Sequence, residues 1–274
     1  MIAFYAMGGG LGHLTRVRAF IHTYAIKGPF KVITANPAVF RFFTNEQVVF
    51  IESDKKTTRA ELAQKIQSAT HDLVFKDLYV DAFPCGILGE LSGELIPSER
   101  QHYLARRLIW KNYEPLLNSD ATFNSIYRFE PLDIDHQAFI QNHGNQIIKS
   151  PLNFDFLISK KPPSTKKLLQ PLWLIVHSTH LEELKLLLDY AQDIAKLEQV
   201  NPHFVVLSDV SIPLPDSVEL LMHENPMDWY PLAERIFTGG GFNTWHQLQP
   251  WRNKHTALPF KRKFDDQFWR VGLK

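Results

Sequence analysis

Cysteine, long apolar runs and net charge are all scarce in this sequence of 274 residues. Its single cysteine, Cys85, rules out an internal disulfide and cannot build a zinc site from thiolates. No stretch approaches about 18 consecutive apolar residues, so we expect no membrane-spanning helix. The 30 basic residues almost balance the 29 acidic ones, which argues against a broad nucleic-acid-binding surface. Because the chain opens directly on an apolar, strand-like run, we expect no leader segment and a cytoplasmic location.

Strand-like and helix-like patterns alternate along the first half of the chain. Residues 2–6 are apolar and predict a buried strand, and the apolar spacing that follows predicts a helix over 14–25. Asn36 is the predicted N-cap of a short helix that begins at Pro37. Strands separated by helices form parallel sheets with helices on their faces. Further strands are predicted over 30–34, 48–51, 72–79 and 121–128, and further helices over 59–68 and 98–117.

Lysine and proline concentrate between residues 149 and 171, as in an exposed linker. We therefore predict an N-terminal α/β domain over 1–160, a linker over 161–171 and a smaller, truncated α/β domain over 172–274. The expected fold class is α/β, with two Rossmann-like domains whose parallel sheets face each other across a cleft. In the second domain we predict strands over 172–176, 204–207, 218–222, 236–238 and 257–260, and a helix over 181–197.

A glycine-rich turn, GGGLGH at residues 8–13, follows the first predicted strand. Such a strand–turn–helix junction presents free backbone N–H groups to an anion. The side chain of His13 has a near-neutral intrinsic pKa, which suits a general base; the alternative is a histidine that hydrogen-bonds its own loop. The turn lacks the dinucleotide fingerprint, because residue 13 is not glycine, and the sequence contains no Gly-Lys-Ser/Thr phosphate loop.

A second glycine-rich turn, Gly239–Gly241, follows another strand-like run and precedes a predicted helix start. Its backbone amides suit a diphosphate, and the helix field would stabilise charge on a leaving nucleotide. Asp266 and Gln267 offer acceptors and a donor for sugar hydroxyls, although a helix N-cap at Asp265 or Asp266 is an alternative. The remaining candidates for ligand contacts are Asn243 and Thr244 at the helix start and Arg262 in the basic run 261–263, for which a solvated loop is the alternative.

Two further loops follow predicted strands. Asp81 is placed so that it could orient His13, and capping of a helix near Gly86 is an equal alternative. Ser178 lies in the loop after the first strand of the second domain, where side chains would face the cleft. The run 133–135 matches an Asp-x-Asp metal motif but falls in a predicted loop toward the linker, so we interpret it as structural and expect no metal.

The combination of GGGLGHLTR at 8–16, DAFPCG at 81–86, GGGFNT at 239–244 and PFKRKFDDQ at 259–267 resembles the two-domain glycosyltransferases of the GT-B fold. The likeness covers essentially the whole chain. It is closest to predicted bacterial glycosyltransferases related to the lipid-linked peptidoglycan N-acetylglucosaminyltransferase. It implies metal-independent, inverting transfer of a sugar from a nucleotide donor, usually uridine diphosphate, to an acceptor hydroxyl, with no cofactor.

The resemblance also implies roles for individual residues. His13 would be the base that deprotonates the acceptor, and the N-terminal domain, with Gly9, Gly10 and Gly12 in its loop, would bind that acceptor. The C-terminal domain would bind the donor. There the resemblance implies that the diphosphate is held by Gly239, Gly240, Gly241, Asn243 and Thr244, and that the donor sugar is contacted by Asp266 and Gln267.

Two departures from the family pattern matter. His246 stands where such enzymes usually carry a glutamate that grips the ribose, and an imidazole cannot accept from two hydroxyls at once. The sequence ends at Lys274, whereas relatives usually continue into helices that brace the first domain, so we expect a looser hinge or apolar surface for a partner subunit. Two alternatives therefore stay open: a nucleotide-sugar hydrolase of the same fold, and a non-catalytic nucleotide-sugar-binding or scaffold protein.

Association with other surfaces also stays open. A basic, aromatic helix predicted around residues 100–111 could face an anionic lipid surface, which would make the protein peripheral at the inner membrane face. The simpler interpretation is that its apolar residues are core and its charges are solvated. Homo-oligomerisation is left open as well.

Overall fold

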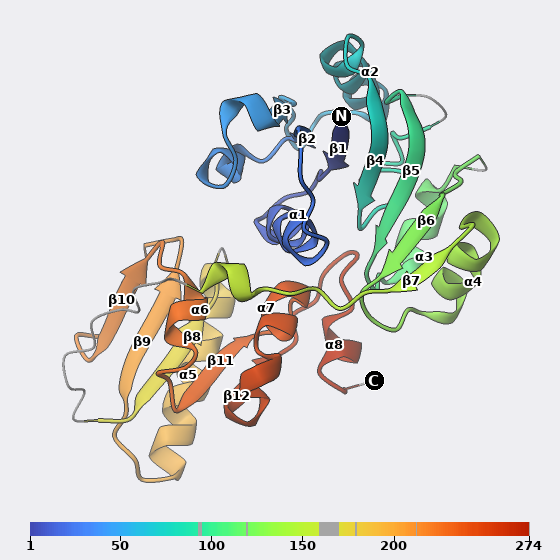
Figure 1. Cartoon of the computed structure of the whole chain (residues 1–274). Coiled ribbons are helices and arrows are strands. Elements are labelled where there is room, and N and C mark those ends of the chain that lie inside the picture. Colours follow the sequence, from blue (N-terminus) through green and yellow to red (C-terminus); the bar gives the residue numbers. More distant parts are fainter. Residues whose placement is uncertain (93–94, 119, 159–169, 179, 212, 274) are drawn as a thin grey trace. The chain divides into compact units, whose positions relative to one another are not determined.

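The computed structural model describes residues 1–92, 95–118, 120–158, 170–178, 180–211 and 213–273. The chain divides into two compact units, Met1–Asn153 (unit 1) and Phe154–Lys274 (unit 2), and each contains a parallel sheet (Figure 1). The predicted fold class, α/β with two Rossmann-like parallel sheets, is confirmed. Most of the predicted linker, residues 161–169, lies outside the described residues.

Unit 1 contains a seven-stranded parallel sheet in the order β3-β2-β1-β4-β5-β6-β7. The chain builds outward from β1 in one direction and from β4 in the other, so the strand order reverses between these two strands; ligands bind at such switch points in open α/β sheets. The strands are β1 (Ile2–Tyr5), β2 (Phe30–Thr34), β3 (Val48–Phe50), β4 (Phe75–Asp81), β5 (Ser98–Ala105), β6 (Ser125–Arg128) and β7 (Ile147–Lys149). The helices are α1 (Gly12–Thr23), α2 (Arg59–Thr70), α3 (Trp110–Tyr113) and α4 (Ile134–His143), with short 3-10 helices at Pro37–Arg41, Asn45–Gln47 and Glu114–Leu116.

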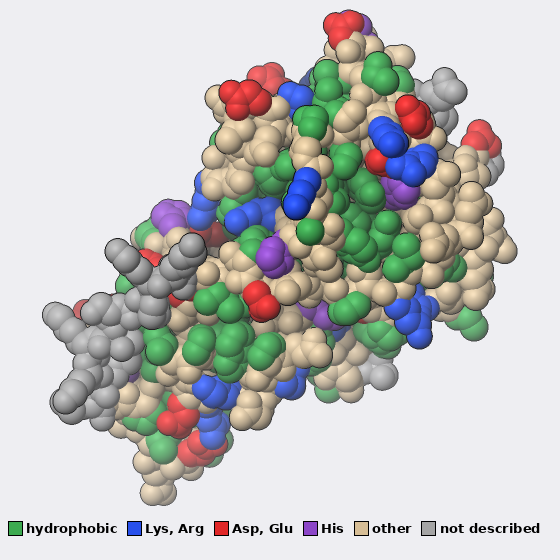
Figure 2. Space-filling model, viewed as in Figure 1, with side chains coloured by type: hydrophobic (Ala, Val, Ile, Leu, Met, Phe, Trp, Pro, Cys, Tyr) green, Lys and Arg blue, Asp and Glu red, His purple; other side chains and the backbone are tan. Residues whose placement is uncertain are grey.

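Side-chain alternation along β4 sends Asp77, Tyr79 and Asp81 to one face of the sheet. That face packs on α1, where the Phe20 ring lies 5.1 Å from the Tyr79 ring. Figure 2 shows hydrophobic side chains gathered over β4 and β5. The opposite face is buried with α2 in a cluster that includes Leu62, Ile66, Tyr5 and Val80. Asp81, the last residue of β4, therefore ends on the α1 side of the sheet.

The predicted helix over 98–117 is wrong, because the segment forms β5 and only then a short α3. β5 lies between β4 and β6, so Tyr103, Leu104 and Ala105 are all buried, with 0% exposure. Burial on both faces removes the alternation that marks a half-exposed strand, and such a run cannot be told from a buried helix by its pattern. The basic, aromatic helix predicted around residues 100–111 is therefore also wrong.

Unit 2 contains a five-stranded parallel sheet in the order β10-β9-β8-β11-β12, with its switch point between β8 and β11. The predicted helix over 181–197 is confirmed as α5, which buries Leu184, Leu187 and Leu188 against the sheet. The strands are β8 (Leu172–Val176), β9 (His203–Ser208), β10 (Val218–Met222), β11 (Arg235–Gly239) and β12 (His255–Leu258). The helices are α5 (Leu181–Leu197), α6 (Pro226–Trp229), α7 (Phe242–Gln247) and α8 (Gln267–Arg270), with 3-10 helices at Asp155–Leu157 and Gln249–Lys254. Across the described part of the chain, no helix is both long enough and apolar enough to cross a membrane.

Candidate functional site

His13 and Asp81 meet at the switch point of unit 1. His13 lies in the first turn of α1, directly after the glycine-rich turn, and Asp81 ends β4. The His13 Nδ1 atom is 2.6 Å from Asp81 Oδ2. The structure thus brings together the two residues that the sequence predicted as a base and its orienting acid. The alternative expectation was that Asp81 caps a helix near Gly86. The described residues around Gly86 form turns and contain no such helix.

Arg16, to which the sequence assigned no role, completes this group. It stands one turn after His13 on α1, and its Nε and Nη2 atoms donate to the two Asp81 oxygens, each at 2.8 Å. Burial alone would raise the pKa of Asp81, but the Arg16 guanidinium and the His13 imidazole outweigh it and hold that pKa at about 2. Asp81 is therefore a buried, ionised carboxylate.

The His13 ring is uncharged at neutral pH. Burial lowers the pKa of His13 below its usual 6.5 and Arg16 and Arg106 act in the same direction, while Asp81 opposes them without cancelling the effect. An Asp81 carboxylate can only accept, so the neutral ring carries its proton on Nδ1 and donates it there. Nε2 is then left with a lone pair, which is the state that a general base needs.

Gly8 makes room for the His13 ring. A Cβ placed on Gly8 would lie 2.2 Å from His13 Nε2, closer than any real contact. Gly8 was not among the predicted site residues, although its position at the start of the glycine-rich turn was the available signal. The three glycines that were predicted are arranged differently: Gly9 is exposed, the Gly10 carbonyl accepts from the Asn36 side chain at 2.9 Å, and Gly12 opens α1.

The second glycine-rich turn joins β11 to α7 at the switch point of unit 2. Gly239 ends β11 and Gly241 is the N-cap of α7. A Cβ on Gly240 would lie 2.9 Å from Val271 and 3.3 Å from Gln267 Cβ, so this residue packs against α8. A Cβ on Gly241 would meet no described atom within 4 Å, so the open side of the turn is at Gly241.

Asp266 and Gln267 are both buried, and Gln267 lies beside this turn. Asp266 is the N-cap of α8 and accepts from the Trp269 amide at 3.3 Å, so the alternative expectation of an N-cap is confirmed. The Gln267 side-chain oxygen accepts from the Phe260 amide at 3.0 Å. Arg270 of the same helix donates to the Gly240 carbonyl at 2.8 Å. These contacts make α8 a support for the glycine-rich turn.

The other predicted residues of unit 2 lie around the same switch point. Asn243 and Thr244 are in the first turn of α7, and the His246 ring packs against Phe242 with centroids 4.4 Å apart. Ser178 is exposed in the loop after β8. Arg262 is bound by Glu183 of α5, which the sequence did not single out because the two residues are 79 positions apart.

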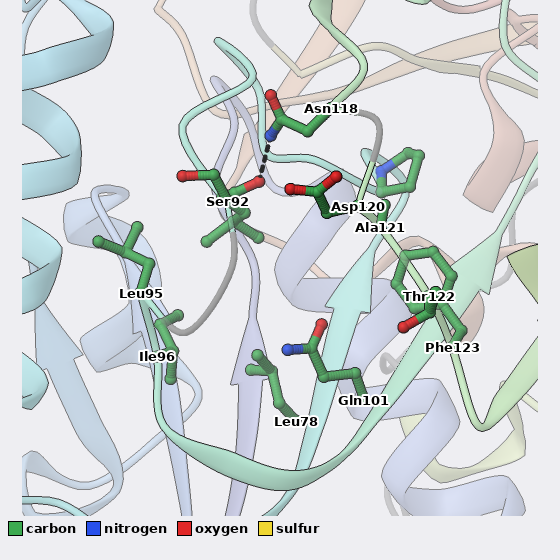
Figure 3. Close-up of a pocket in the computed structure, with 12 residues that line it drawn as sticks. Leu78, Ser92, Leu95, Ile96, Gln101, Asn118, Asp120, Ala121, Thr122 and Phe123 are labelled. Carbon is green, nitrogen blue, oxygen red and sulfur yellow. Dashed lines mark hydrogen bonds between the residues drawn. The ribbon is translucent and has the colours of Figure 1, made fainter.

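A cavity of about 160 Å³ lies elsewhere in unit 1, on the face of β4 and β5 that carries Leu78 and Gln101 (Figure 3). None of the predicted site residues lines it. The run 133–135 was predicted to lie in a loop, but it begins α4: Asp133 is the N-cap and accepts from the Asp135 amide. Within the described ranges, no three or more His, Cys, Asp or Glu side chains are grouped so that they could hold a metal ion.

Neither a protein-family model nor a curated protein matches this sequence. Among solved structures, the chain is similar to the glycosyltransferase of kitacinnamycin, with a TM-score of 0.65 and 12% identity over 98% of this chain and 83% of that chain. For the spinosyn forosaminyltransferase SpnP the TM-score is 0.58 at 12% identity, over 99% of this chain and 82% of that chain. For the spinosyn rhamnosyltransferase SpnG complexed with thymidine diphosphate, the TM-score is 0.50 at 13% identity, over 95% of this chain and 81% of that chain. At such identities the likeness shows the fold alone, which is that of the GT-B glycosyltransferases.

Proposed function

We propose that this protein is a glycosyltransferase that moves a sugar from a nucleoside diphosphate donor to an acceptor hydroxyl. The observation that carries the proposal is the buried pair of His13 and Asp81, held at the end of β4 with an uncharged imidazole. A neutral histidine backed by an ionised aspartate is an arrangement that accepts a proton from a hydroxyl. The GT-B fold of both units supports the same class of reaction.

In the proposed reaction the acceptor hydroxyl gives its proton to His13 Nε2. Its oxygen bonds to the anomeric carbon of the donor sugar, while the bond from that carbon to the diphosphate oxygen breaks and the diphosphate leaves with the electron pair. Asp81 stabilises the imidazolium that forms. Attack from the side opposite the leaving group would invert the anomeric carbon. Gly8 leaves open the space against Nε2 that a side chain would fill.

Unit 2 would bind the donor at its glycine-rich turn. The open side at Gly241, with Asn243 and Thr244 in the first turn of α7, would receive the diphosphate, and Arg262 would add a cation. The sequence motifs favour a uridine diphosphate, since they resemble those of the peptidoglycan N-acetylglucosaminyltransferase group. His246 would meet the ribose in place of the usual glutamate.

The test is calorimetric binding of a panel of nucleoside diphosphates in chelator, followed by product analysis with the matching nucleotide sugars. Transfer to an added alcohol or glycan acceptor in chelator would support a metal-independent transferase. Loss of activity that manganese restores would refute metal independence. Free sugar released equally with and without acceptor would identify a hydrolase, and no nucleotide binding at all would favour the non-catalytic alternative.

A further inference from the structure

The Glu183 carboxylate of unit 2 lies among groups that suit an external anion. Arg262 donates to both of its oxygens, at 2.6 Å from Nη1 and 2.5 Å from Nη2. His177 Nε2 lies 2.9 Å from Glu183 Oε2. A guanidinium that binds two oxygens side by side is the usual way in which arginine holds either a carboxylate or a phosphate. Glu183 therefore occupies a place that phosphate oxygens could take.

This cluster borders the glycine-rich turn. The pairing of β8 with β11 makes His177 and Gly239 neighbours at the carboxyl ends of the two strands. A Cβ on Gly239 would lie 3.5 Å from His177 Nδ1 and 3.3 Å from the Phe260 ring. The Phe260 ring also lies 5.7 Å from the Arg262 guanidinium. The His177 and Phe260 rings, with centroids 5.5 Å apart, thus lie between the turn and Arg262.

Glu183 carries its negative charge in this setting. Burial would raise the pKa of Glu183, but Arg262 and His177 outweigh it and lower that pKa. The side chains of Arg262 and Glu183 are 26% and 20% exposed, so a dissolved ligand can reach both. An ionised carboxylate here repels a diphosphate and engages the guanidinium that would bind it.

We infer that Glu183 is a built-in anion that competes with the donor's diphosphate for Arg262. The identity of the ligand rests on the proposed function, whereas the competition rests on the contacts of Glu183. Binding exchanges two hydrogen bonds of Arg262 from the carboxylate to phosphate oxygens, and Glu183 turns to solvent. The exchange weakens binding of the nucleotide, which favours release of the nucleoside diphosphate product.

The experiment compares the wild type with Glu183→Gln, and uses Glu182→Gln as a matched control. Glu182 carries the same charge in the same turn of α5 but is exposed. Calorimetry measures the affinities for inorganic pyrophosphate, uridine diphosphate and thymidine diphosphate, and thermal unfolding checks that each variant is folded. We expect Glu183→Gln to bind pyrophosphate and its nucleotide about 10- to 100-fold more tightly, the range that a released charge-assisted hydrogen bond supplies. Glu182→Gln should change affinity less than about threefold, as for an exposed charge.

The possible outcomes separate the two proposals. A gain in pyrophosphate affinity without any nucleotide binding would support the competition and overturn the proposed donor site. The competition would be overturned if Glu183→Gln left nucleotide affinity unchanged, weakened it, or improved it no more than Glu182→Gln does. The proposed function would still stand in that case. A folded Glu183→Gln protein that binds none of the three anions would also overturn the competition. In the double variant Glu183→Gln/Arg262→Gln the gain should disappear.

Discussion

His13 and Arg16 reach the same carboxylate from one turn of α1. His13 Nδ1 is 2.6 Å from Asp81 Oδ2, and Arg16 Nη2 is 2.8 Å from that same oxygen. Asp81 itself ends β4, so the pair of side chains also fixes the start of α1 to the end of its neighbouring strand. The arginine keeps the carboxylate charged, and the carboxylate keeps the proton of the imidazole on Nδ1. The orientation of the proposed base thus depends on two residues besides itself.

Replacing the carboxylate without changing its shape tests this dependence. Asp81→Asn should lower turnover by about 100-fold or more, because an amide neither stabilises the imidazolium nor fixes the tautomer. Asp77→Asn is the matched control, since Asp77 lies on the same face of β4 and contacts another histidine, His102, at 3.0 Å. That variant should keep its turnover. Equal losses in the two variants would mean that the effect is structural.

The dependence of turnover on pH should report the ionisation of His13. Burial lowers the pKa of this residue below 6.5, so the neutral base is present at neutral pH and is lost as the pH falls through that lowered value. We therefore expect kcat/KM to be flat near pH 7 and to fall on the acid side of about pH 6.5, the unperturbed value for histidine. A fall that begins above neutrality, or one that persists in His13→Gln, would contradict the assignment.

Gly8→Ala tests the space beside the imidazole. The new methyl group would lie 2.2 Å from His13 Nε2 and must displace the ring from Asp81. Turnover should fall about 10-fold or more, as expected when a reacting group is misplaced, while nucleotide binding in unit 2 stays unchanged. Gly9→Ala should have the smaller effect, because a Cβ there meets no described atom within 4 Å. A larger loss in Gly9→Ala would show that the loop, and not the ring position, is what matters.

Gly240→Ala should act on stability rather than directly on the ligand. Its Cβ would lie 2.9 Å from Val271, so α8 must shift, at a cost of about 1–3 kcal/mol for overpacking. A lowered Tm in thermal unfolding would be the measurement. A side chain at residue 240 points at α8 and not at the open side of the turn at Gly241. An unchanged Tm would show that α8 yields easily.

Local sequence patterns predicted the structure correctly where it depends on residues that are close together in the chain. The turn at residues 8–13, the capping of the short helix by Asn36, and the long amphipathic α5 each depend on neighbours in the chain, and the structure contains all three. The segment that forms β5 was mistaken for a helix because it is buried on both faces at its carboxyl end. Its neighbours β4 and β6 decide its structure, and no local pattern reveals them.

The contacts within each of the two candidate sites, one in unit 1 and one in unit 2, are not local. Arg16 of α1 binds Asp81 across 65 positions and Arg262 binds Glu183 of α5 across 79, so the strand order and the packing of the helices on the sheets together bring these residues into contact. Asp81 could be proposed for its role because strand ends gather at one edge of a parallel sheet. The partner of Arg262 could not, because Glu183 lies in a helix whose rotation about its own axis is set by core packing in unit 2.

The short contact between His13 and Asp81 should also give a proton NMR signal that reports on the proposed base in unit 1. A proton held between an imidazole nitrogen and a buried carboxylate oxygen 2.6 Å apart is shielded from exchange with water and should resonate far downfield in a proton NMR spectrum. Its signal should disappear in Asp81→Asn and persist in Asp77→Asn. The state of the proposed base can thus be observed in solution before any substrate is known.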